Sequence, residues 1–454
     1  MSFKPFLLKA AVISIHESGV LTETDAVKLP LIPVDIQNLL DSRGIPTLIM
    51  GQTVSDAVER LKTAPCHILF IGNHIPHLRQ ASACGMITAC IVPDPNDNEN
   101  PDNFDFMIGD ITQLVHVLRL GTPMPMGKFP CDLLEQYLHD FEFQDASVII
   151  NPGIGEDTAA IDIQSSEILI LKSDPITFAT DSIGYYTVLI NANDIATSGA
   201  NPRWLLTTLL FPPQSTPSQA FQVMQDLKTA CYRWGITLCG GHTEITDAVT
   251  RSVVTGMMAG TVARSRLLNK QNIRTGDTVW ITKSLAVEGT SIIARELGDR
   301  LLLSGYTDDE INQLKNFLFS ISILDEAKIA ADTPGVVAMH DVTEGGLAAA
   351  VLELSAAGRH ILEIFMEAIP IYPETDRLCR LLNINPLGLI ASGSLLICCR
   401  PDHSHTLIDN MAHNQVPLTL IGAVGRPGKG VDAKKQGKSV KWPEFDTDEI
   451  TRLL

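Results

Sequence analysis

The sequence lacks the patterns that mark secreted, zinc-binding or membrane-spanning chains. Its nine cysteines form no CxxC pair, so neither a disulfide framework nor a zinc knuckle is indicated. No apolar run reaches about 18 residues, the length at which a membrane-spanning helix is expected. The N-terminal FLLKAAVISI is interrupted by Lys9 and has no cleavage-site pattern, which favours a buried strand over a signal peptide. We therefore expect buried thiols in a reducing cytosol, that is, a cytoplasmic protein with no membrane partner.

Positive charge is also scarce. The chain has 34 Lys and Arg against 52 Asp and Glu, a formal net charge of −18, which argues against a nucleic-acid partner. It does not exclude a nucleotide, because a local site can be rich in cations or filled with Mg²⁺. The length of 454 residues predicts two or three domains, since a single hydrophobic core rarely grows so large.

The pattern along the chain changes near residue 120. Residues 1–120 alternate strand-like and helix-like segments, which predicts a small parallel α/β sheet. Residues 121–130 are rich in Pro and Gly and are interpreted as a linker. Beyond them, long β-rich stretches mix with helices. This predicts an α+β arrangement in two halves, residues 131–262 and 274–430.

Two adjacent carboxylates stand in a glycine turn between two expected strands. In VIINPGIGEDTAAIDI (148–163), Gly153 and Gly155 precede Glu156 and Asp157. One interpretation is a solvated turn in which the acids accept bonds from nearby backbone N–H groups. The other is a site for a hard cation, because Mg²⁺ prefers oxygen ligands and usually shares them with phosphates.

Three further acids favour the cation. KSDPIT places Asp174, NANDIATSGANP places Asp194 after Asn193, and MHDVTEGGL places Asp341, each interpreted as the end of an apolar strand beside small residues. Four acidic strand ends would crowd like charges unless cations neutralise them. The sequence therefore predicts a nucleotide site with several Mg²⁺ ions.

Phosphate also needs hydrogen-bond donors. Thr343 is a plausible N-cap, with Gly345 and Gly346 in the first turn of the helix that follows, and such helix starts favour anions. A second glycine pair, Gly240 and Gly241, is expected at a strand end before His242, Thr243 and Glu244. Each pair taken singly also fits an ordinary cap or tight turn. A Walker A motif is absent.

Taken in order, GIGEDTAAI, KSDPIT, NANDIATSGANP, GGHTE and HDVTEGGL resemble the aminoimidazole ribonucleotide (AIR) synthetase superfamily. Selenophosphate synthetase, thiamine-monophosphate kinase and the hydrogenase-maturation protein HypE also belong to it. The resemblance covers roughly residues 125–430 and is nearest to the HypE-like, AIR synthase-related branch. It implies a PurM-like fold of two halves, a homodimer whose N-terminal halves share a β-barrel, and ATP bound near the dimer interface.

The resemblance also implies roles for individual residues. It assigns the Mg²⁺ ions that bridge the triphosphate to four carboxylates: Asp157, Asp174, Asp194 and Asp341. It assigns nucleotide contacts to Gly153, Gly155, Glu156, Asn193, Gly240, Gly241, His242, Thr343, Gly345 and Gly346. His242 replaces the Asp common in the kinase branch, which puts one metal ligand in doubt. Glu156 stands where Asp is usual and keeps the charge.

Departures from the family narrow the expected function. HypE proteins end in a cysteine that is carbamoylated, whereas this chain ends in FDTDEITRLL. Selenophosphate synthetases need a Cys or selenocysteine in a flexible glycine-rich loop, whereas Cys131 lies in a helical pattern. We expect ATP- and Mg²⁺-dependent phosphorylation or activation of an oxygen atom on a small-molecule acceptor, with release of ADP. The alternative is a nucleotide-binding maturation or regulatory factor that acts through protein partners.

A homodimer also follows from the strand pattern. Three stretches of the first half, EILILKSD, RWLLTTLLF and SVVTGMMAGTV, are apolar almost throughout, so both faces of their sheet need cover. Only residues 185–199 and 217–234 carry strong helical patterns there. A second copy of the chain is expected to cover what these helices leave exposed.

The first 120 residues carry a second resemblance. AVISIHESGVLTE and LFIGNHIPHLRQASACGMITACIV are similar to the first and last motifs of the haloacid-dehalogenase (HAD) phosphatase fold. That fold needs an Asp nucleophile at the end of the first strand, where this chain has Ser14. The metal-binding acids of the last motif would fall at Asn73 and His77. The resemblance implies a degenerate, catalytically inactive HAD-like domain; His74 and His77 could bind a metal, or be solvated or capping residues.

Overall fold

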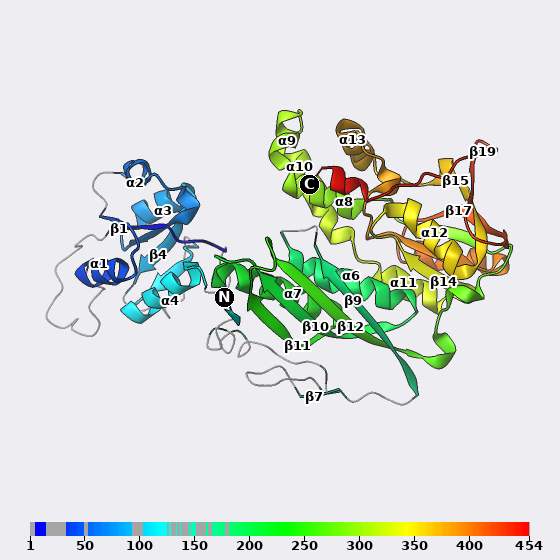
Figure 1. Cartoon of the computed structure of the whole chain (residues 1–454), viewed down its shortest axis with the longest axis horizontal. Coiled ribbons are helices and arrows are strands. Elements are labelled where there is room, and N and C mark those ends of the chain that lie inside the picture. The colour runs from blue at the N-terminus through cyan, green and yellow to red at the C-terminus, as the bar shows by residue number, and fades with distance from the viewer. Residues whose placement is uncertain are drawn as a thin grey trace. The chain divides into compact units, whose positions relative to one another are not determined.

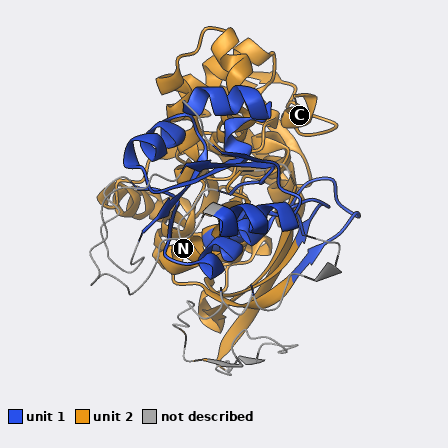
Figure 2. Ribbon diagram, turned by 90° about the vertical axis from the view of Figure 1, so that its left-hand side faces the viewer, with its two compact units in different colours: residues 1–140, 210–225, 243–252 blue, residues 141–209, 226–242, 253–454 orange. Residues whose placement is uncertain are grey.

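The computed structural model describes most of the 454-residue chain (Figure 1). The described residues are 5–14, 33–49, 53–92, 103–124, 127–128, 147–150, 160–161, 166–177 and 181–453, with positions 133, 137 and 145. The chain forms two compact units, coloured separately in Figure 2. The first consists of residues 1–140, 210–225 and 243–252, and the second of residues 141–209, 226–242 and 253–454.

The first unit contains the predicted parallel sheet. Its strands, in the spatial order β2-β1-β3-β4-β5, are β1 (Ala10–Ser14), β2 (Thr47–Ile49), β3 (Ile68–Gly72), β4 (Ile87–Ile91) and β5 (Phe106–Ile108). Its helices are α1 (Pro33–Ser42), α2 (Val54–Leu61), α3 (Ile75–Ala83) and α4 (Ile111–Gly121). Successive strand residues enter two separate cores, one with α1 and α4 and one with α2 and α3. The strands are continuously apolar because both faces are covered. The alternation predicted for residues 1–120 is confirmed.

A segment distant in sequence completes this unit. The buried backbone N–H of Phe6 donates to Ser218 Oγ at 2.9 Å, and the Thr216 hydroxyl donates to the Phe6 carbonyl at 2.9 Å. Phe221 packs against the core formed with α1 and α4. These residues lie in or just before α7 (Pro217–Trp234), a helix whose bounds match the predicted 217–234. The first unit is therefore not made of the N-terminal residues alone.

A second sheet follows, in the spatial order β6-β11-β10-β12-β9. Its strands are β6 (Gly127–Lys128), β9 (Glu167–Ile176), β10 (Asn201–Phe211), β11 (Thr237–Ile245) and β12 (Val253–Ala263). Helix α6 (Ile183–Thr197) packs on β9 and β12. Two glycines of β12 make this close approach possible. A Cβ on Gly256 would lie 2.5 Å from Asn191 Nδ2, and one on Gly260 would lie 2.5 Å from Ile195 Cγ2.

One expected strand is a helix. YTVLINANDIA was interpreted as a strand that delivers Asp194 to its end, whereas these residues form most of α6. The competing helical pattern at 185–199 is the one the structure follows. The helix is buried on nearly every side. A helix apolar all round has no period by which it could be told from a buried strand.

The C-terminal half is built on a 7-stranded sheet in the order β14-β16-β13-β17-β15-β18-β19. Its strands are β13 (Thr278–Thr282), β14 (Val336–Asp341), β15 (His360–Phe365), β16 (Leu395–Cys399), β17 (Leu418–Pro427), β18 (Val431–Lys435) and β19 (Lys438–Val440). Its helices are α8 (Val287–Glu296), α9 (Gly298–Leu303), α10 (Asp308–Lys315), α11 (Leu324–Asp332), α12 (Gly346–Gly358), α13 (Pro373–Leu382) and α14 (Ser404–His413). All pairings are antiparallel except that of β15 with β18. Cys398 and Cys399 are buried in β16.

Within the described part of the chain, no helix combines the length and apolar character needed to cross a lipid bilayer.

Candidate nucleotide site

Carboxylates from three elements meet around one lysine. Lys172 and Asp174 lie two residues apart on β9, Asp194 lies on α6, and Asp341 ends β14. The Lys172 ammonium stands 3.0 Å from Asp194 Oδ2 and 3.6 Å from Asp174 Oδ2. The two aspartates therefore share one cation, although no sequence argument had singled out Lys172. Three of the four carboxylates predicted to hold Mg²⁺ are brought to the same place.

Asp341 is the deepest of the three acids. Its side chain is 5 % exposed, and its Oδ2 atom is buried without a hydrogen-bond partner. The Nε2–H group of the neighbouring His340 donates to Glu353 Oε2 at 3.0 Å, while Nδ1 of the same ring lies 3.8 Å from Asp341 Oδ1. A buried carboxylate oxygen without a partner is costly unless a cation reaches it. This atom is the strongest local sign that a cation belongs here.

The charges shift one another's protonation. Burial, followed by the charge of Asp341, raises the pKa of Asp194 to about 7, although Lys172 opposes the shift. Burial lowers the pKa of Lys172, but the charges of Asp194, Asp174 and Asp341 outweigh it and leave that pKa raised. Ionisation of all three aspartates is therefore unfavourable unless positive charge lies beside them, which is the electrostatic condition for a cation site.

These residues fit Mg²⁺ that arrives with a polyphosphate better than a metal centre made of protein ligands alone. Within the described ranges, no group of three His, Cys, Asp or Glu side chains is placed to hold a metal ion. Mg²⁺, however, is usually held by one or two carboxylates, with phosphate oxygens and waters completing the shell. Asp341 and Asp194 could supply those two carboxylates.

The asparagines beside the acids are structural. Asn193, predicted to shape the nucleotide site, is buried and clamps the segment before α11: its Nδ2 donates to the Ile321 carbonyl at 2.9 Å and its Oδ1 accepts from the Ile323 N–H at 3.0 Å. Asn191 was not predicted, yet its Nδ2 reaches the Asp174 carbonyl at 3.3 Å. It ties α6 to the strand that carries Lys172. The only sequence sign of it was the repeated Asn of NAND.

The Thr343–Gly346 turn differs from its prediction. Thr343 is not the N-cap, because α12 begins at Gly346 and Gly345, at φ 77°, takes that position. The Gly345 N–H already donates to Asp448 Oδ2 at 2.7 Å, and the Gly346 N–H donates to the Thr343 carbonyl at 3.0 Å. A Cβ on Gly346 would lie 2.5 Å from the Leu387 carbonyl oxygen. The glycines thus serve tight packing and an internal carboxylate in this state.

The second glycine pair lies within a strand and not at its end. Gly240, Gly241 and His242 are inside β11, and His242 is exposed. A Cβ on Gly241 would lie 2.1 Å from the Thr207 carbonyl oxygen of β10, so glycine is required for that approach. The expectation of a strand end failed because the glycines interrupt the apolar pattern without ending the strand.

The glycine turn that carries the two adjacent carboxylates lies outside the described residues. Gly153, Gly155, Glu156 and Asp157 all fall in the range 151–159. The strands on either side, β7 (Val148–Ile150) and β8 (Ala160–Ile161), pair antiparallel, as expected for a turn that joins two strands.

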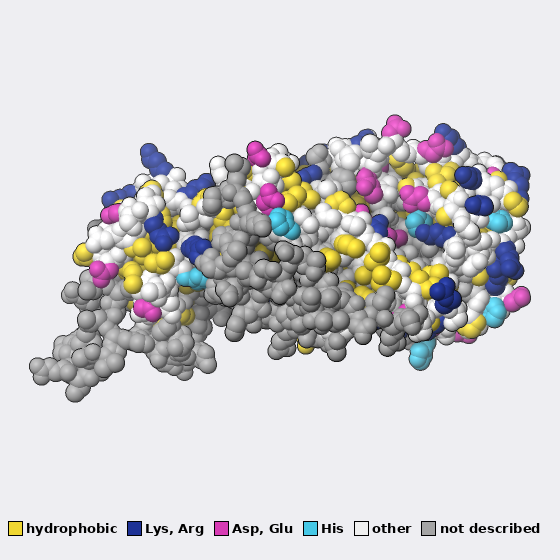
Figure 3. Space-filling view, turned by 60° about the horizontal axis from the view of Figure 1, so that its bottom comes forward, with side chains coloured by type: hydrophobic (Ala, Val, Ile, Leu, Met, Phe, Trp, Pro, Cys, Tyr) yellow, Lys and Arg dark blue, Asp and Glu magenta, His cyan; other side chains and the backbone are white. Residues whose placement is uncertain are grey.

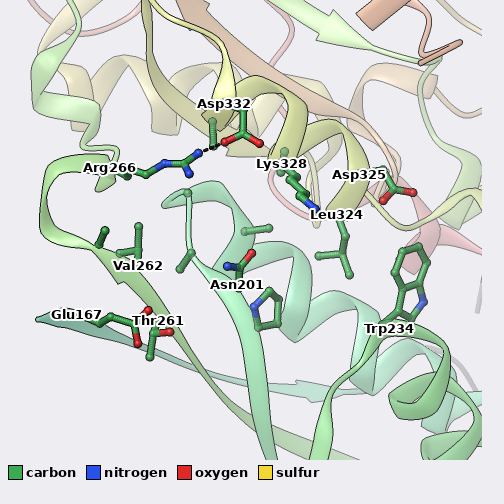
Figure 4. A pocket seen from close by; sticks show the side chains of 17 residues that line it. Glu167, Asn201, Trp234, Thr261, Val262, Arg266, Leu324, Asp325, Lys328 and Asp332 are labelled. Carbon is green, nitrogen blue, oxygen red and sulfur yellow. Dashed lines mark hydrogen bonds and ion pairs between the residues drawn. The ribbon is translucent and has the colours of Figure 1, made fainter. Parts of the chain in front are cut away.

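A separate hollow in the second unit has a volume of about 430 Å³ (Figure 4). Asn201, Trp234 and Leu324 lie along it, with the ion pair of Arg266 and Asp332 on one side. Acids and bases alternate around it, and no single ligand chemistry is indicated.

The parallel sheet of the first unit has its own polar cluster. Ser14 ends β1 and is buried, and its hydroxyl lies 3.1 Å from His77 Nδ1. The rings of His74 and His77 pack edge to face, with their centroids 4.2 Å apart. In doubly wound sheets of this strand order, ligands bind between β1 and β3 at the carboxyl ends of the strands. The cluster occupies that position without a carboxylate at Ser14, Asn73 or His77.

Comparison with known proteins places more than half of the chain in a family. Residues 155–262 match the N-terminal domain of AIR synthase related protein, and residues 274–433 match its C-terminal domain. The chain belongs to this AIR synthase related family. Each match lies largely within one of the two predicted halves, 131–262 and 274–430, whose bounds stay predictions.

The chain is also similar to individual proteins. Carbamoyl dehydratase HypE of Cupriavidus necator is 24 % identical over 264 residues, covering 57 % of this chain and 72 % of its own. Selenide, water dikinase of Aeromonas hydrophila is 26 % identical over 240 residues, covering 52 % and 66 %. Among solved structures, E. coli HypE aligns with a TM-score of 0.59 at 22 % identity, covering 70 % of this chain and 98 % of its own. A HypE structure in complex with ATP aligns with a TM-score of 0.57 at 18 % identity, covering 69 % and 95 %. These structures support the PurM-like fold of two halves that the resemblance implied, whereas the β-barrel shared between two copies stays a prediction.

Proposed function

We propose that the chain is an ATP- and Mg²⁺-dependent enzyme that phosphorylates or activates an oxygen atom of a small-molecule acceptor and releases ADP. One observation carries the proposal: Asp174, Asp194 and Asp341 gather around the Lys172 ammonium, and Asp341 Oδ2 is buried without a hydrogen-bond partner. The relatives are ATP-using enzymes, and this chain is an enzyme of the same family. Mg²⁺ would supply charge neutralisation along the triphosphate.

Each residue near this point would have a defined task. Asp341 and Asp194 would hold one Mg²⁺ together with phosphate oxygens, and Asp174, at the edge of β9, would hold a further ion of those that accompany the triphosphate. Asn191 fixes the Asp174 backbone through its 3.3 Å bond and so sets the distance between β9 and α6. Asp157, outside the described residues, would be a further Mg²⁺ ligand, and Gly153, Gly155 and Glu156 would contact the nucleotide. Gly240, Gly241, His242, Thr343, Gly345 and Gly346 would line it.

The last described turn of the chain packs against the C-terminal half. Asp448 Oδ2 accepts from the Gly345 N–H at 2.7 Å, and Glu449 Oε2 accepts from the Asn385 N–H at 2.7 Å. We favour an acceptor oxygen on a free small molecule.

Two further features complete the proposal. The chain would form a homodimer through the sheet of β9 to β12, and the first unit would be a degenerate HAD-like domain without phosphatase chemistry. The exposed face of β9 and β12 supports the dimer, and the absence of an acid at Ser14 supports the second point.

The test is ADP release by the purified full-length chain with ATP and Mg²⁺, first alone and then with a panel of acids, amides, alcohols and phosphate esters. We expect low basal release that one compound class raises at least tenfold. The Asp341→Asn variant should lose this release, whereas Asp402→Asn, an exposed acid elsewhere, should keep it. If ATP binds but no compound raises turnover, the alternative, a nucleotide-binding factor that acts through protein partners, is favoured instead.

A further inference from the structure

Lys172 is the unexpected member of the carboxylate cluster. Its ammonium lies within 3.0 Å of Asp194 and 3.6 Å of Asp174, at the point where two ligands of a divalent ion would meet. A lysine ammonium and a metal ion cannot both occupy that point, because each needs the same carboxylate oxygens. The described structure thus has a tethered cation where the proposed function needs a free one.

Three features show that this contact is exchangeable. The Lys172 side chain is 35 % exposed, so the ammonium can leave toward solvent without breaking a packed core. The Asp194 Oδ2 atom, although 3.0 Å from Lys172 Nζ, accepts no well-aligned hydrogen bond. The long lysine side chain has many rotamers, whereas an Arg fork would hold the carboxylates in a fixed geometry.

The cluster stays negative when Lys172 is paired. Asp341 retains its buried, unpartnered Oδ2 atom, and His340 beside it is paired with the exposed Glu353. One ammonium cannot offset three aspartates, so a second positive charge is still favoured. A divalent ion alone would have to displace Lys172. A metal–nucleotide complex brings phosphates that could accept the displaced ammonium.

From this geometry we propose that Lys172 is a positioning residue that blocks metal binding in the absence of nucleotide. It holds Asp174 and Asp194 together in the empty site and competes with free Mg²⁺ for them. It yields only when polyphosphate arrives to accept its charge. Metal and nucleotide binding are thereby coupled. This inference rests on the proposed function for the identity of the nucleotide, but its first test does not need a nucleotide.

The test is Mn²⁺ binding to the full-length protein, measured by electron paramagnetic resonance of free Mn²⁺ with Mn²⁺ as the probe for Mg²⁺. Without nucleotide, wild type should bind Mn²⁺ weakly, and Lys172→Met should bind it about tenfold or more tightly, because a unit charge beside the ligands has been removed. Lys172→Arg should stay weak. Lys429→Met, a change at an exposed lysine, should match wild type. Urea unfolding of each variant shows which of them are folded.

With ATP present, wild type should gain much more Mn²⁺ affinity than Lys172→Met gains, so the coupling between the two ligands shrinks in the variant. Equal or weaker Mn²⁺ affinity of Lys172→Met without nucleotide overturns the inference. If Lys172→Met does not fold, Lys172→Gln is subject to the same criterion. If neither ATP nor its analogues bind wild type, the proposed function fails, and the metal-only comparison still decides the role of Lys172.

Discussion

At the scale of single residues, the site combines opposing charges at short range. Asp194 shares Lys172 with Asp174 and is repelled by the buried Asp341. Removing one acid therefore removes a metal ligand and also relieves repulsion in the empty site. Ligand binding and unliganded stability should respond in opposite directions, which is the expected behaviour of a functional site and not of a structural ion pair.

Asp194→Asn should abolish the stabilisation of the protein by Mg²⁺ and ATP while leaving its unliganded stability unchanged or higher at pH 8. Burial and the charge of Asp341 raise the pKa of Asp194 to about 7, so at pH 8 the carboxylate is ionised in an environment that disfavours its charge, and the amide removes that cost. Thermal unfolding with and without Mg²⁺-ATP measures both effects. We expect the same loss for Asp157→Asn. An undiminished shift of the melting temperature in both variants would show that the site has been assigned to the wrong residues.

A second buried acid sets a pH dependence. Burial raises the pKa of Glu288 to about 7, although the Ser392 N–H donates to its carboxylate at 3.0 Å. Between the ordinary carboxyl pKa and this value, the folded state binds the proton that the unfolded state has lost. Stability should therefore fall as pH rises through that window, by up to about 1.4 kcal/mol per pH unit from this group.

Glu288→Gln keeps the shape and the Ser392 bond but cannot ionise. Its free energy of unfolding should change less between pH 5.5 and pH 8 than that of wild type, and at pH 8 it should be the higher of the two. Urea denaturation at both pH values measures this difference. A variant whose loss between the two pH values equals that of wild type would show that Glu288 is not the titrating group.

At the scale of elements, β9 and β12 present different faces. Helix α6 covers one face through Gly256 and Gly260. On the other, Leu171 is 56 % exposed and Met257 44 %. Figure 3 shows several hydrophobic side chains gathered on the face that it views. Exposed apolar strands favour association through an isologous contact.

Leu171→Glu should convert the expected homodimer into a monomer. Wild type should scatter light as twice the chain mass of 49.4 kDa at low micromolar concentration, and the variant as that mass. A charge buried at a two-fold interface meets its own copy, so repulsion adds to desolvation. Leu303→Glu is the matched control, because Leu303 is 91 % exposed on α9. A wild-type protein that stays monomeric and binds ATP would contradict the dimer and its connection with the site.

At the scale of the whole molecule, two units with different architectures share one chain (Figure 2). The parallel sheet of the first keeps the topology at which doubly wound proteins bind ligands. At that place it has Ser14 and His77 in hydrogen-bond contact. No described residue there supplies the carboxylate that an aspartyl-phosphate mechanism needs.

The full-length protein should therefore not hydrolyse p-nitrophenyl phosphate, with or without Mg²⁺. The assay compares wild type with a protein-free blank over several hours. Hydrolysis above the blank that Ser14→Ala or His77→Ala removes would show that the first unit is catalytic after all. Hydrolysis that both variants retain would place the activity elsewhere in the chain.

The sequence by itself determined the features that depend on local pattern. Alternating segments gave the parallel sheet of the first unit, and five ordered motifs gave the AIR synthase related family with its two halves. The acids Asp174, Asp194 and Asp341 were identified because several acids at expected strand ends would crowd like charges without a cation, although Asp194 lies on a helix. Their residue types were sufficient for that inference, since acid clusters need a cation wherever the chain places them.

Only the tertiary structure decided which residues meet. Asp194 lies on a helix, because an evenly apolar segment carries no period, and packing on Gly256 and Gly260 selects the conformation. Asn193 proved to be a clamp for the segment before α11, and Gly345 donates to Asp448, because those partners are about a hundred residues away in sequence. Lys172 was missed for the same reason. A lysine within a strand is ordinary until Asp194, from another element, lies 3.0 Å from its ammonium.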